Sequence, residues 1–222
     1  MKFHAIVSAV AGIAVCATAA TAQVCQGDLS FRGKQKHVGA ALGMSEGATS
    51  FGGGLTVGHS KGWFGGGSLG MTNYDGVGGS SVGLGGGVGY SMPLQNKSKW
   101  QMCPGATLSL GFGPNSDIGG NTARIQSQTA ALGLSVGTSM PMNKTVNVLP
   151  FASASVAYTR ATLKLNGTST SGSDNYMVFG VGAGFQFSPN LVVRPSLSIL
   201  AAADENRDNT IFGLGLTWAI GR

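Results

Sequence analysis

Hydrophobic residues recur at every second position along most of the chain, and residues 210–220 show this pattern most clearly. Strand side chains alternate between two faces, so one face of this segment carries Phe212, Leu214, Leu216, Trp218 and Ile220. Neither face is charged, and the opposite face carries Gly213, Gly215, Thr217 and Ala219. A soluble strand normally exposes polar or charged side chains on one face, whereas a narrow membrane barrel needs apolar residues outside and small ones inside. We therefore expect a transmembrane β-strand here.

The same two-residue period returns in ten segments, each of a suitable length for a tilted membrane strand. They cover residues 38–44, 51–57, 63–71, 82–90, 100–112, 130–136, 148–158, 179–187, 191–199 and 212–220. The pattern predicts an all-β fold, an up-and-down antiparallel transmembrane β-barrel of about ten strands. Eight strands are the alternative, because the glycine-rich hairpins between Phe51 and Tyr90 specify their register weakly.

The connections between these segments alternate in character, which predicts an orientation in the membrane. Short or lysine-bearing turns, typical of the periplasmic side, are expected at residues 59–62, 93–99, 141–146 and 188–190. Outer loops rich in Gly, Ser, Asn and Asp are expected at residues 73–80, 113–122, 166–175 and 204–209. Both ends of the barrel then lie on the periplasmic side.

Aromatic residues gather at the ends of the predicted strands, as Trp and Tyr do at the two interfaces of a membrane. The predicted periplasmic girdle contains Trp63, Tyr90, Trp100 and Trp218. The predicted outer girdle contains Phe51, Tyr74, Phe112, Tyr158, Tyr176 and Phe212. Of the strand aromatics, only Phe64 and Phe151 are expected to point into the barrel.

Composition and the N-terminal residues predict an exported membrane protein. With 38 Gly and only 10% charged residues among 222, the chain is unusual for a soluble domain. Residues 1–22 have the positive start, apolar run and small-residue cleavage site of a signal peptide. We expect residues 23–35 to form an N-terminal periplasmic arm and residues 36–222 the barrel. The net charge of +6 is spread along the chain without a basic run, so no nucleic-acid partner is expected.

Two cysteines remain after the predicted cleavage, Cys25 in the arm and Cys103 at the periplasmic end of a strand. Disulfides persist outside the cytoplasm, so we expect these two residues to pair and to hold the arm at or inside the periplasmic mouth. His37 and His59 lie at the same end, but their spacing matches no zinc signature. Neither a metal site nor a cofactor is therefore expected.

Arg194 is the one charged residue that the alternation places inside the lumen within a strand. Such an arginine could favour the passage of anions through a pore. The alternative is a plug residue bonded to strand carbonyls or to the arm, where Asp28 is the nearby carboxylate, because side chains usually fill a small barrel.

A catalytic role is disfavoured by the predicted placement of titratable residues. The histidines of the exported chain lie at the periplasmic end, whereas seven of the eight carboxylates, all except Asp28, are expected at the outer end. A hydrolase needs a base within hydrogen-bond reach of its nucleophile. We therefore do not expect an enzyme.

The closing strand resembles the insertion signal of small bacterial outer-membrane β-barrel proteins, the group that includes OmpA-type transmembrane domains and OmpW-like barrels. Leu214, Leu216, Trp218 and Ile220 match its alternation, although Gly221 and Arg222 follow where the family has a terminal aromatic residue. The resemblance implies an outer-membrane location, contact with its lipid and insertion by the barrel-assembly machinery. The expected role is structural or surface-interacting; a passive pore for small solutes and a surface adhesin or ligand-binding barrel are the alternatives. Nothing in the pattern indicates an oligomeric state.

Overall fold

The computed structural model describes residues 23–31, 34–59, 62–75, 79–95, 99–118, 121–165, 168–202 and 210–220. The predicted signal peptide, residues 1–22, and the predicted loop at residues 204–209 lie outside the described residues. In the described part of the chain, no helix combines the length and the apolar character needed to cross a membrane.

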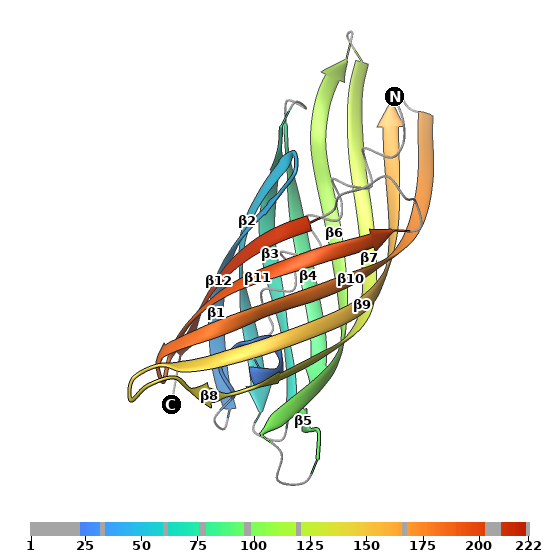
Figure 1. Cartoon of the computed structure of the whole chain (residues 1–222). Coiled ribbons are helices and arrows are strands. Elements are labelled where there is room, and N and C mark those ends of the chain that lie inside the picture. The colour runs from blue at the N-terminus through green and yellow to red at the C-terminus, as the bar shows by residue number, and fades with distance from the viewer. Residues whose placement is uncertain are drawn as a thin grey trace.

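Antiparallel strands make up nearly the whole described chain (Figure 1). They are β1 (Lys34–Ser45), β2 (Ala48–His59), β3 (Trp63–Tyr74), β4 (Ser80–Tyr90), β5 (Met92–Pro93), β6 (Trp100–Ile118), β7 (Asn121–Thr138), β8 (Met140–Pro141), β9 (Asn147–Leu165), β10 (Thr168–Ser188), β11 (Leu191–Ala202) and β12 (Thr210–Ile220). A 3-10 turn, η2 (Val24–Gln26), precedes them.

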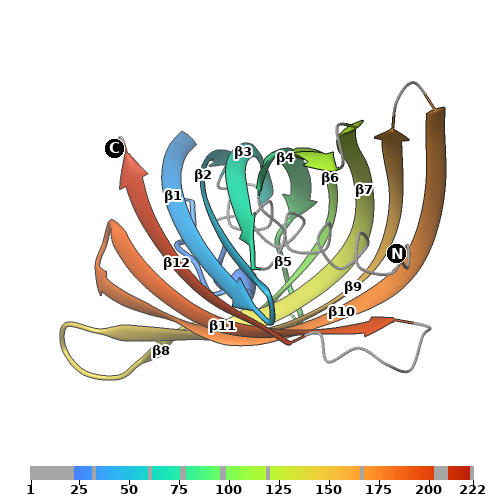
Figure 2. The ribbon, with the colours of Figure 1, turned by 90° about the horizontal axis from the view of Figure 1, so that it is seen from above.

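The sheet closes on itself into a barrel. Of its 12 strands, β5 and β8 are only two residues long and lengthen the β4–β6 and β7–β9 pairings, which leaves ten strands around the barrel. Each of the ten pairs with its neighbours in chain order, and the circle is completed where β12 runs antiparallel to β1 (Figure 2). The prediction of a ten-stranded up-and-down barrel is confirmed, and the alternative of eight strands is excluded.

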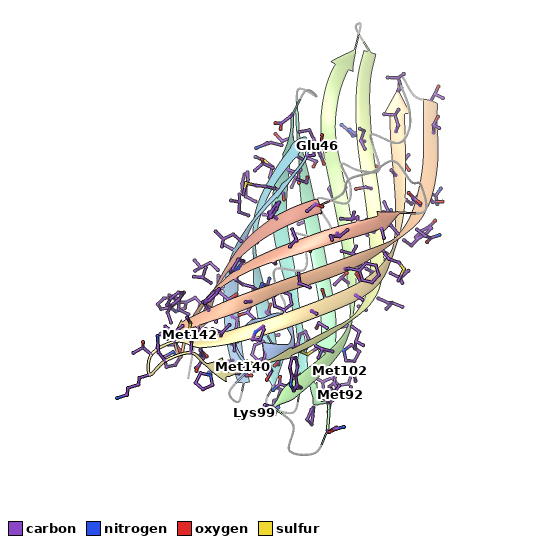
Figure 3. The ribbon with its side chains drawn as sticks, viewed as in Figure 1. Glu46, Met92, Lys99, Met102, Met140 and Met142 are labelled. Carbon is purple, nitrogen blue, oxygen red and sulfur yellow. A yellow bond between two sulfur atoms is a disulfide. The ribbon has the colours of Figure 1, made fainter. Side chains whose placement is uncertain are left out.

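Burial alternates with the predicted period of two. On β12, Phe212 and Trp218 are 59% and 52% exposed on the outside, whereas Ile211 and Thr217 are 5% and 6% exposed on the inside. Large apolar side chains project outward from the barrel wall all round it (Figure 3). In water this surface would be strongly unfavourable, but lipid matches it.

The aromatic residues follow the face of their strand. Trp63, Trp100, Trp218, Phe51, Phe112, Tyr158 and Phe212 are exposed on the outer face, and the ring of the partly exposed Tyr90 lies 4.8 Å from that of Trp63.

The predicted outer girdle is wrong at Tyr74 and Tyr176, because both residues belong to the inner face. Tyr176 is 5% exposed and its hydroxyl lies 3.3 Å from Oγ1 of Thr159, while the Tyr74 hydroxyl lies 3.0 Å from Oγ of the buried Ser81. Each tyrosine is an even number of residues from an inward-facing neighbour on its strand, and this parity outweighs the preference of tyrosine for the interface. The expectation that only Phe64 and Phe151 point inward is therefore wrong.

Two of the predicted outer loops are strands. β6 runs to Ile118 and β7 starts at Asn121, and likewise β9 runs to Leu165 and β10 starts at Thr168. The two hairpins pair with each other from Ala123 and Leu165 downward. We call β6, β7, β9 and β10 the tall sheet: they have 18 to 21 residues, the other strands of the ring 11 or 12. The tall sheet rises above the rest of the rim (Figure 1). Mutual pairing satisfies its backbone groups without a membrane, which explains why polar residues continue as strands.

Candidate functional site in the barrel lumen

The N-terminal arm enters the barrel at the end where β12 finishes, and there it occupies the lumen. Its described residues, 23–31, include η2 and are almost wholly buried: Gln23, Val24, Cys25, Asp28, Leu29 and Phe31 are each at most 7% exposed. Val24 and Leu29 pack against Leu149, Val192 and Ala219 of the barrel wall. Apolar contact with three different strands holds the arm as a packed plug.

A disulfide joins the arm to the wall, as the two-cysteine pattern predicts. Cys25 is bonded to Cys103 of β6, with 6.0 Å between the Cα atoms, and both residues are buried beside Phe31 and Phe64. The bond closes a loop of 78 residues. In the chain-entropy account a loop of this size stabilises the folded state by about 4.5 kcal/mol.

Glycines of the wall make the room that the arm occupies. A Cβ at Gly184 of β10 would meet the carbonyl oxygen of Gly27, and a Cβ at Gly137 of β7 would lie 2.5 Å from the carbonyl oxygen of Val24. Gly27 itself has a φ of 71°, a backbone conformation that favours glycine. The glycine-rich inner face is therefore needed locally for close backbone approach.

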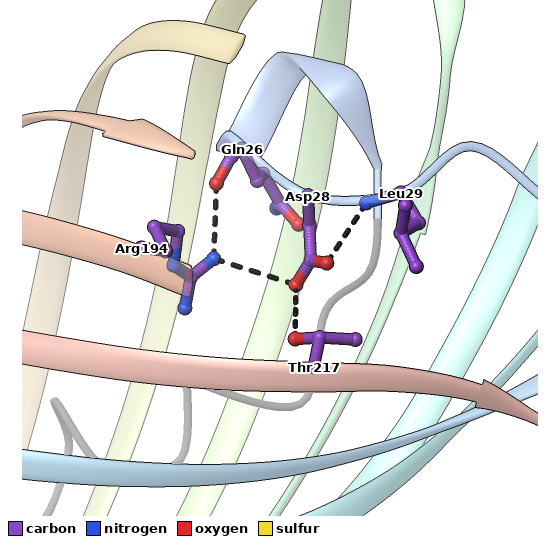
Figure 4. Close-up of polar contacts among 5 residues, drawn as sticks. All are labelled: Gln26, Asp28, Leu29, Arg194 and Thr217. Carbon is purple, nitrogen blue, oxygen red and sulfur yellow. Dashed lines mark hydrogen bonds and ion pairs between the residues drawn. The ribbon is translucent and has the colours of Figure 1, made fainter. Parts of the chain in front are cut away.

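Arg194 of β11 belongs to a polar network with the arm (Figure 4). Its Nη1 donates a hydrogen bond of 2.9 Å to the carbonyl oxygen of Gln26 and lies 3.9 Å from Oδ2 of Asp28. Oδ2 also accepts a 2.8 Å hydrogen bond from the Thr217 hydroxyl, and Oδ1 accepts one of 2.8 Å from the Leu29 N–H. The guanidinium thus ties the arm to β11, and the carboxylate ties it to β12.

Burial dominates the electrostatics of this network. The Asp28 residue is 1% exposed, and loss of solvation raises the pKa of its carboxyl above the ordinary 3.8, against the opposing effects of Arg194, Thr217 and Leu29. The Arg194 side chain is 13% exposed and its guanidinium lies 5.8 Å from the centre of the Phe151 ring. Both partners of the ion pair are therefore largely withdrawn from water.

Above the arm, the lumen contains a cavity of about 200 Å³. Gln26 and Arg194 line its floor, small residues of several strands line its wall, and Tyr176 and Leu200 belong to its upper part. Tyr176 packs there with Ala157, Leu200 and Ile211 in an apolar cluster. The cavity is thus lined by the packed arm on one side and by members of this apolar cluster on the other.

His37, which has inward parity on β1, is buried in the lumen. It is 1% exposed, its ring stacks on Phe31 with 4.2 Å between centroids, and neither ring nitrogen has a hydrogen-bond partner among the residues that the structure describes. Within the described ranges, no three His, Cys, Asp or Glu side chains are placed to hold a metal ion.

Sequence reasoning brought Cys25, Cys103, Arg194 and Asp28 to one end of the barrel, and the structure places all four there. The sequence did not indicate Thr217 and the Gln26 carbonyl as partners of the network. The inward parity of Thr217 was visible, but no sequence signal indicates which wall residue a folded arm will reach.

Comparisons with known proteins agree with this architecture. The family model described as outer membrane protein beta-barrel domain matches residues 8–219. The crystal structure of the beta domain of the Bordetella autotransporter BrkA superposes with a TM-score of 0.54 at 13% identity, covering 85% of this chain and 100% of that one. Ail, the attachment invasion locus protein of Yersinia pestis, gives a TM-score of 0.41 at 14% identity over 86% of this chain and 100% of its own.

A search of curated protein sequences finds no match. At such low identity the solved structures show the fold alone, whereas the family match spans almost the whole chain. It confirms the resemblance to small bacterial outer-membrane barrels that the closing strand indicated. The chain belongs to the outer membrane protein β-barrel family and is an integral protein of the outer membrane in contact with its lipid.

Proposed function

We propose that this protein is a non-catalytic barrel that is closed at its periplasmic end by its own N-terminal arm and acts through its outer surface or as a structural element of the membrane. The observation that carries the proposal is the double attachment of the arm, by the Cys25–Cys103 disulfide and by the Arg194 network. A residue that lines an open pore would present its charge to water. The Nη1 of Arg194 instead donates a hydrogen bond to the Gln26 carbonyl of the arm.

The proposed orientation places the arm and the end of β12 in the periplasm and the tall sheet outside the cell. Barrels of this class have short periplasmic turns and longer outer connections, and the tall sheet is the longer side here. Insertion would follow the usual route through the barrel-assembly machinery, with β12 as the recognised strand.

The distribution of titratable groups supports a non-catalytic role. Among the described residues His37 has no hydrogen-bond partner, and Glu46 and Asp75 lie at the far end of the barrel from it. Asp28, the described carboxylate at the same end, is already held by Arg194, Thr217 and the Leu29 N–H. Figure 3 shows Glu46 at one rim and Lys99 at the other. A base without a nucleophile or orienting group in reach does not form a hydrolytic site.

Conductance in a planar bilayer tests the closed state against the alternative of a passive pore. We expect the refolded protein, identified by a heat-modifiable band on a gel, to show no steady single-channel steps. Reproducible steps in the wild type would contradict closure by the arm and would favour the passive pore. Altered anion selectivity in Arg194→Ala would then identify the conducting path.

A surface-interaction role, as an adhesin or ligand-binding barrel, is favoured by the tall sheet. Replacing residues 116–123 and 163–170 by two-residue turns would shorten both hairpins while keeping the pairs Asn115–Arg124 and Thr162–Ser171. We expect binding to an array of glycans and matrix proteins to be lost, with the heat-modifiable band unchanged. Unchanged binding would move the interaction elsewhere, and a wild type that binds nothing would leave the structural role.

A further inference from the structure

Three cations share the outward face of the tall sheet. Arg124 of β7 stands directly opposite Lys164 of β9, and Arg160 lies four residues before Lys164 on the same face. All three side chains are exposed. We call Arg124, Arg160 and Lys164 the basic patch.

The basic patch lies just beyond the lipid-facing surface. Tyr158, which is 47% exposed on the same face of β9, precedes Arg160 by two residues, or roughly 7 Å along a strand. Val156, two residues further down, is 54% exposed among the apolar side chains. A charge on the lipid face is costly in the hydrocarbon and tolerated near the interface, so this tyrosine marks the boundary and the patch begins at headgroup level.

No described side chain on this face balances the patch. Like charges directly opposite one another, such as Arg124 and Lys164, repel and weaken a sheet. The cross-strand neighbours on β10 are Ser169, Ser171 and Ser173, and those on β7 are Gln126 and Gln128. Of the two carboxylates in this sheet, Asp174 has the inward parity of Tyr176, and Asp117 pairs with Thr122, two residues beyond the Asn115–Arg124 pair. No carboxylate therefore stands directly opposite any of the three cations on a neighbouring strand.

Charge separates the two sides of the outer rim. The turn between β1 and β2 carries the exposed Glu46, and the exposed Asp75 follows β3 and donates its N–H to the Gly47 carbonyl at 2.9 Å. Among the described side chains, the charges on the short side of the rim are therefore acidic, and those on the outward face of the tall sheet are basic. An anionic ligand at the membrane surface would be held by the tall sheet and repelled from the short side.

On the proposed orientation, which places the tall sheet outside the cell, we propose that the basic patch binds an outer-leaflet lipid through the phosphates of its headgroup. The lipid's chains would lie along the apolar surface below Tyr158, and its phosphates would reach Arg124, Arg160 and Lys164. Arg160 and Lys164 are roughly 14 Å apart along the strand, a span that suits a headgroup with two phosphates better than a single one. Arginine and lysine are the usual phosphate ligands, and serine and glutamine neighbours add hydrogen bonds.

Native mass spectrometry of the refolded protein in detergent micelles tests this site, with a diphosphoryl glycolipid as the probe. Its monophosphoryl and phosphate-free forms are measured beside it. Each cation near a membrane surface contributes a factor of about five, so Arg124→Gln/Arg160→Gln/Lys164→Gln should weaken binding about a hundredfold. Each single substitution should weaken it about fivefold, which provides a readout if the triple variant fails to fold.

The matched control is Lys36→Gln/Lys99→Gln/Lys144→Gln, which removes the same charge from three exposed positions at the opposite end. We expect it to bind as the wild type does. Equal loss in the two triple variants, no loss in the patch variant, or equal binding of the phosphate-free lipid would each overturn the proposal. Pyrophosphate that displaced the lipid at equal concentration would also overturn it, because a soluble anion would then be the ligand.

Discussion

A barrel with Cys25→Ser, Cys103→Ser and Gly184→Leu should conduct ions in a planar bilayer, in contrast to the wild type. The two serines remove the covalent attachment of the arm. The leucine fills the position where a Cβ already meets the Gly27 carbonyl oxygen, so the arm and this side chain exclude each other. The arm is the part that yields, because β10 is hydrogen-bonded to both β9 and β11. Hydrogen exchange of residues 23–31 should rise together with conductance.

Two variants control this experiment. Cys25→Ser/Cys103→Ser alone should remain closed, because the Arg194 network and the packing of Val24 and Leu29 persist. Adding Gly67→Leu instead should change nothing, since a Cβ at this exposed glycine finds its nearest neighbour at 3.6 Å. An arm that exchanges freely in a barrel that still does not conduct would contradict closure by the arm. The cluster around Tyr176 would then be the part that closes the lumen.

The second large effect is expected from Arg194→Met. Removing one partner of a buried ion pair leaves the other uncompensated, which typically costs about 3–5 kcal/mol. Asp28 would keep its hydrogen bonds from Thr217 and Leu29 but would lose the only cation that the structure shows beside it among the described residues. We therefore expect a large loss in the free energy that holds the arm in place, measured by hydrogen exchange with the disulfide intact.

Asp28→Asn/Arg194→Met is the matched variant, because it removes both charges and leaves a neutral side chain that can still accept from Thr217. Replacing both partners of a buried pair is often close to neutral, so the double variant should dock its arm better than Arg194→Met alone. Equal losses in the two variants would show that the Arg194 contact with the Gln26 carbonyl, and not the ion pair, carries the effect.

The loss in the free energy of arm docking caused by Arg194→Met should depend on pH. Burial raises the pKa of Asp28 above 3.8 when the arm is docked, and the lost arginine had opposed that rise. A carboxyl whose pKa is higher in the folded state favours folding below its unfolded pKa, and this contribution disappears as pH rises through the folded pKa. Docking in Arg194→Met should therefore weaken from pH 4 upward, while the double variant should show no such trend. A pH-independent deficit would contradict ionisation of Asp28 as its cause.

The sequence predicted the barrel because its strands obey a rule that is local. Every lipid-facing position must be apolar and every inward position in a narrow barrel must be small or polar, so the period of two is written into each segment, as in residues 210–220. The same rule correctly placed Arg194 inside. Tyr74 and Tyr176 were misassigned because the preference of tyrosine for the interface was weighed above the parity of their strands.

The ends of the strands were less predictable. The pattern predicts loops at residues 113–122 and 166–175, because these segments are rich in Gly, Ser, Asn and Thr, the composition of turns. Only the pairing of four strands with one another, from Ala123 and Leu165 onward, supplies partners for their backbone groups and makes a tall sheet. That pairing also brings Arg124 and Lys164 together from distant parts of the chain.

By itself, the sequence determined the barrel and its inner and outer faces, and it predicted the Cys25–Cys103 pair on the expectation that residues 1–22 are a signal peptide. Only the tertiary structure decided that Asp28 meets Arg194 and Thr217, that Gly184 makes room for Gly27 and that three cations share one face. The physical reason is separation along the chain. Alternation acts between neighbouring residues, whereas these contacts join segments whose distance and direction are set only once the barrel has closed.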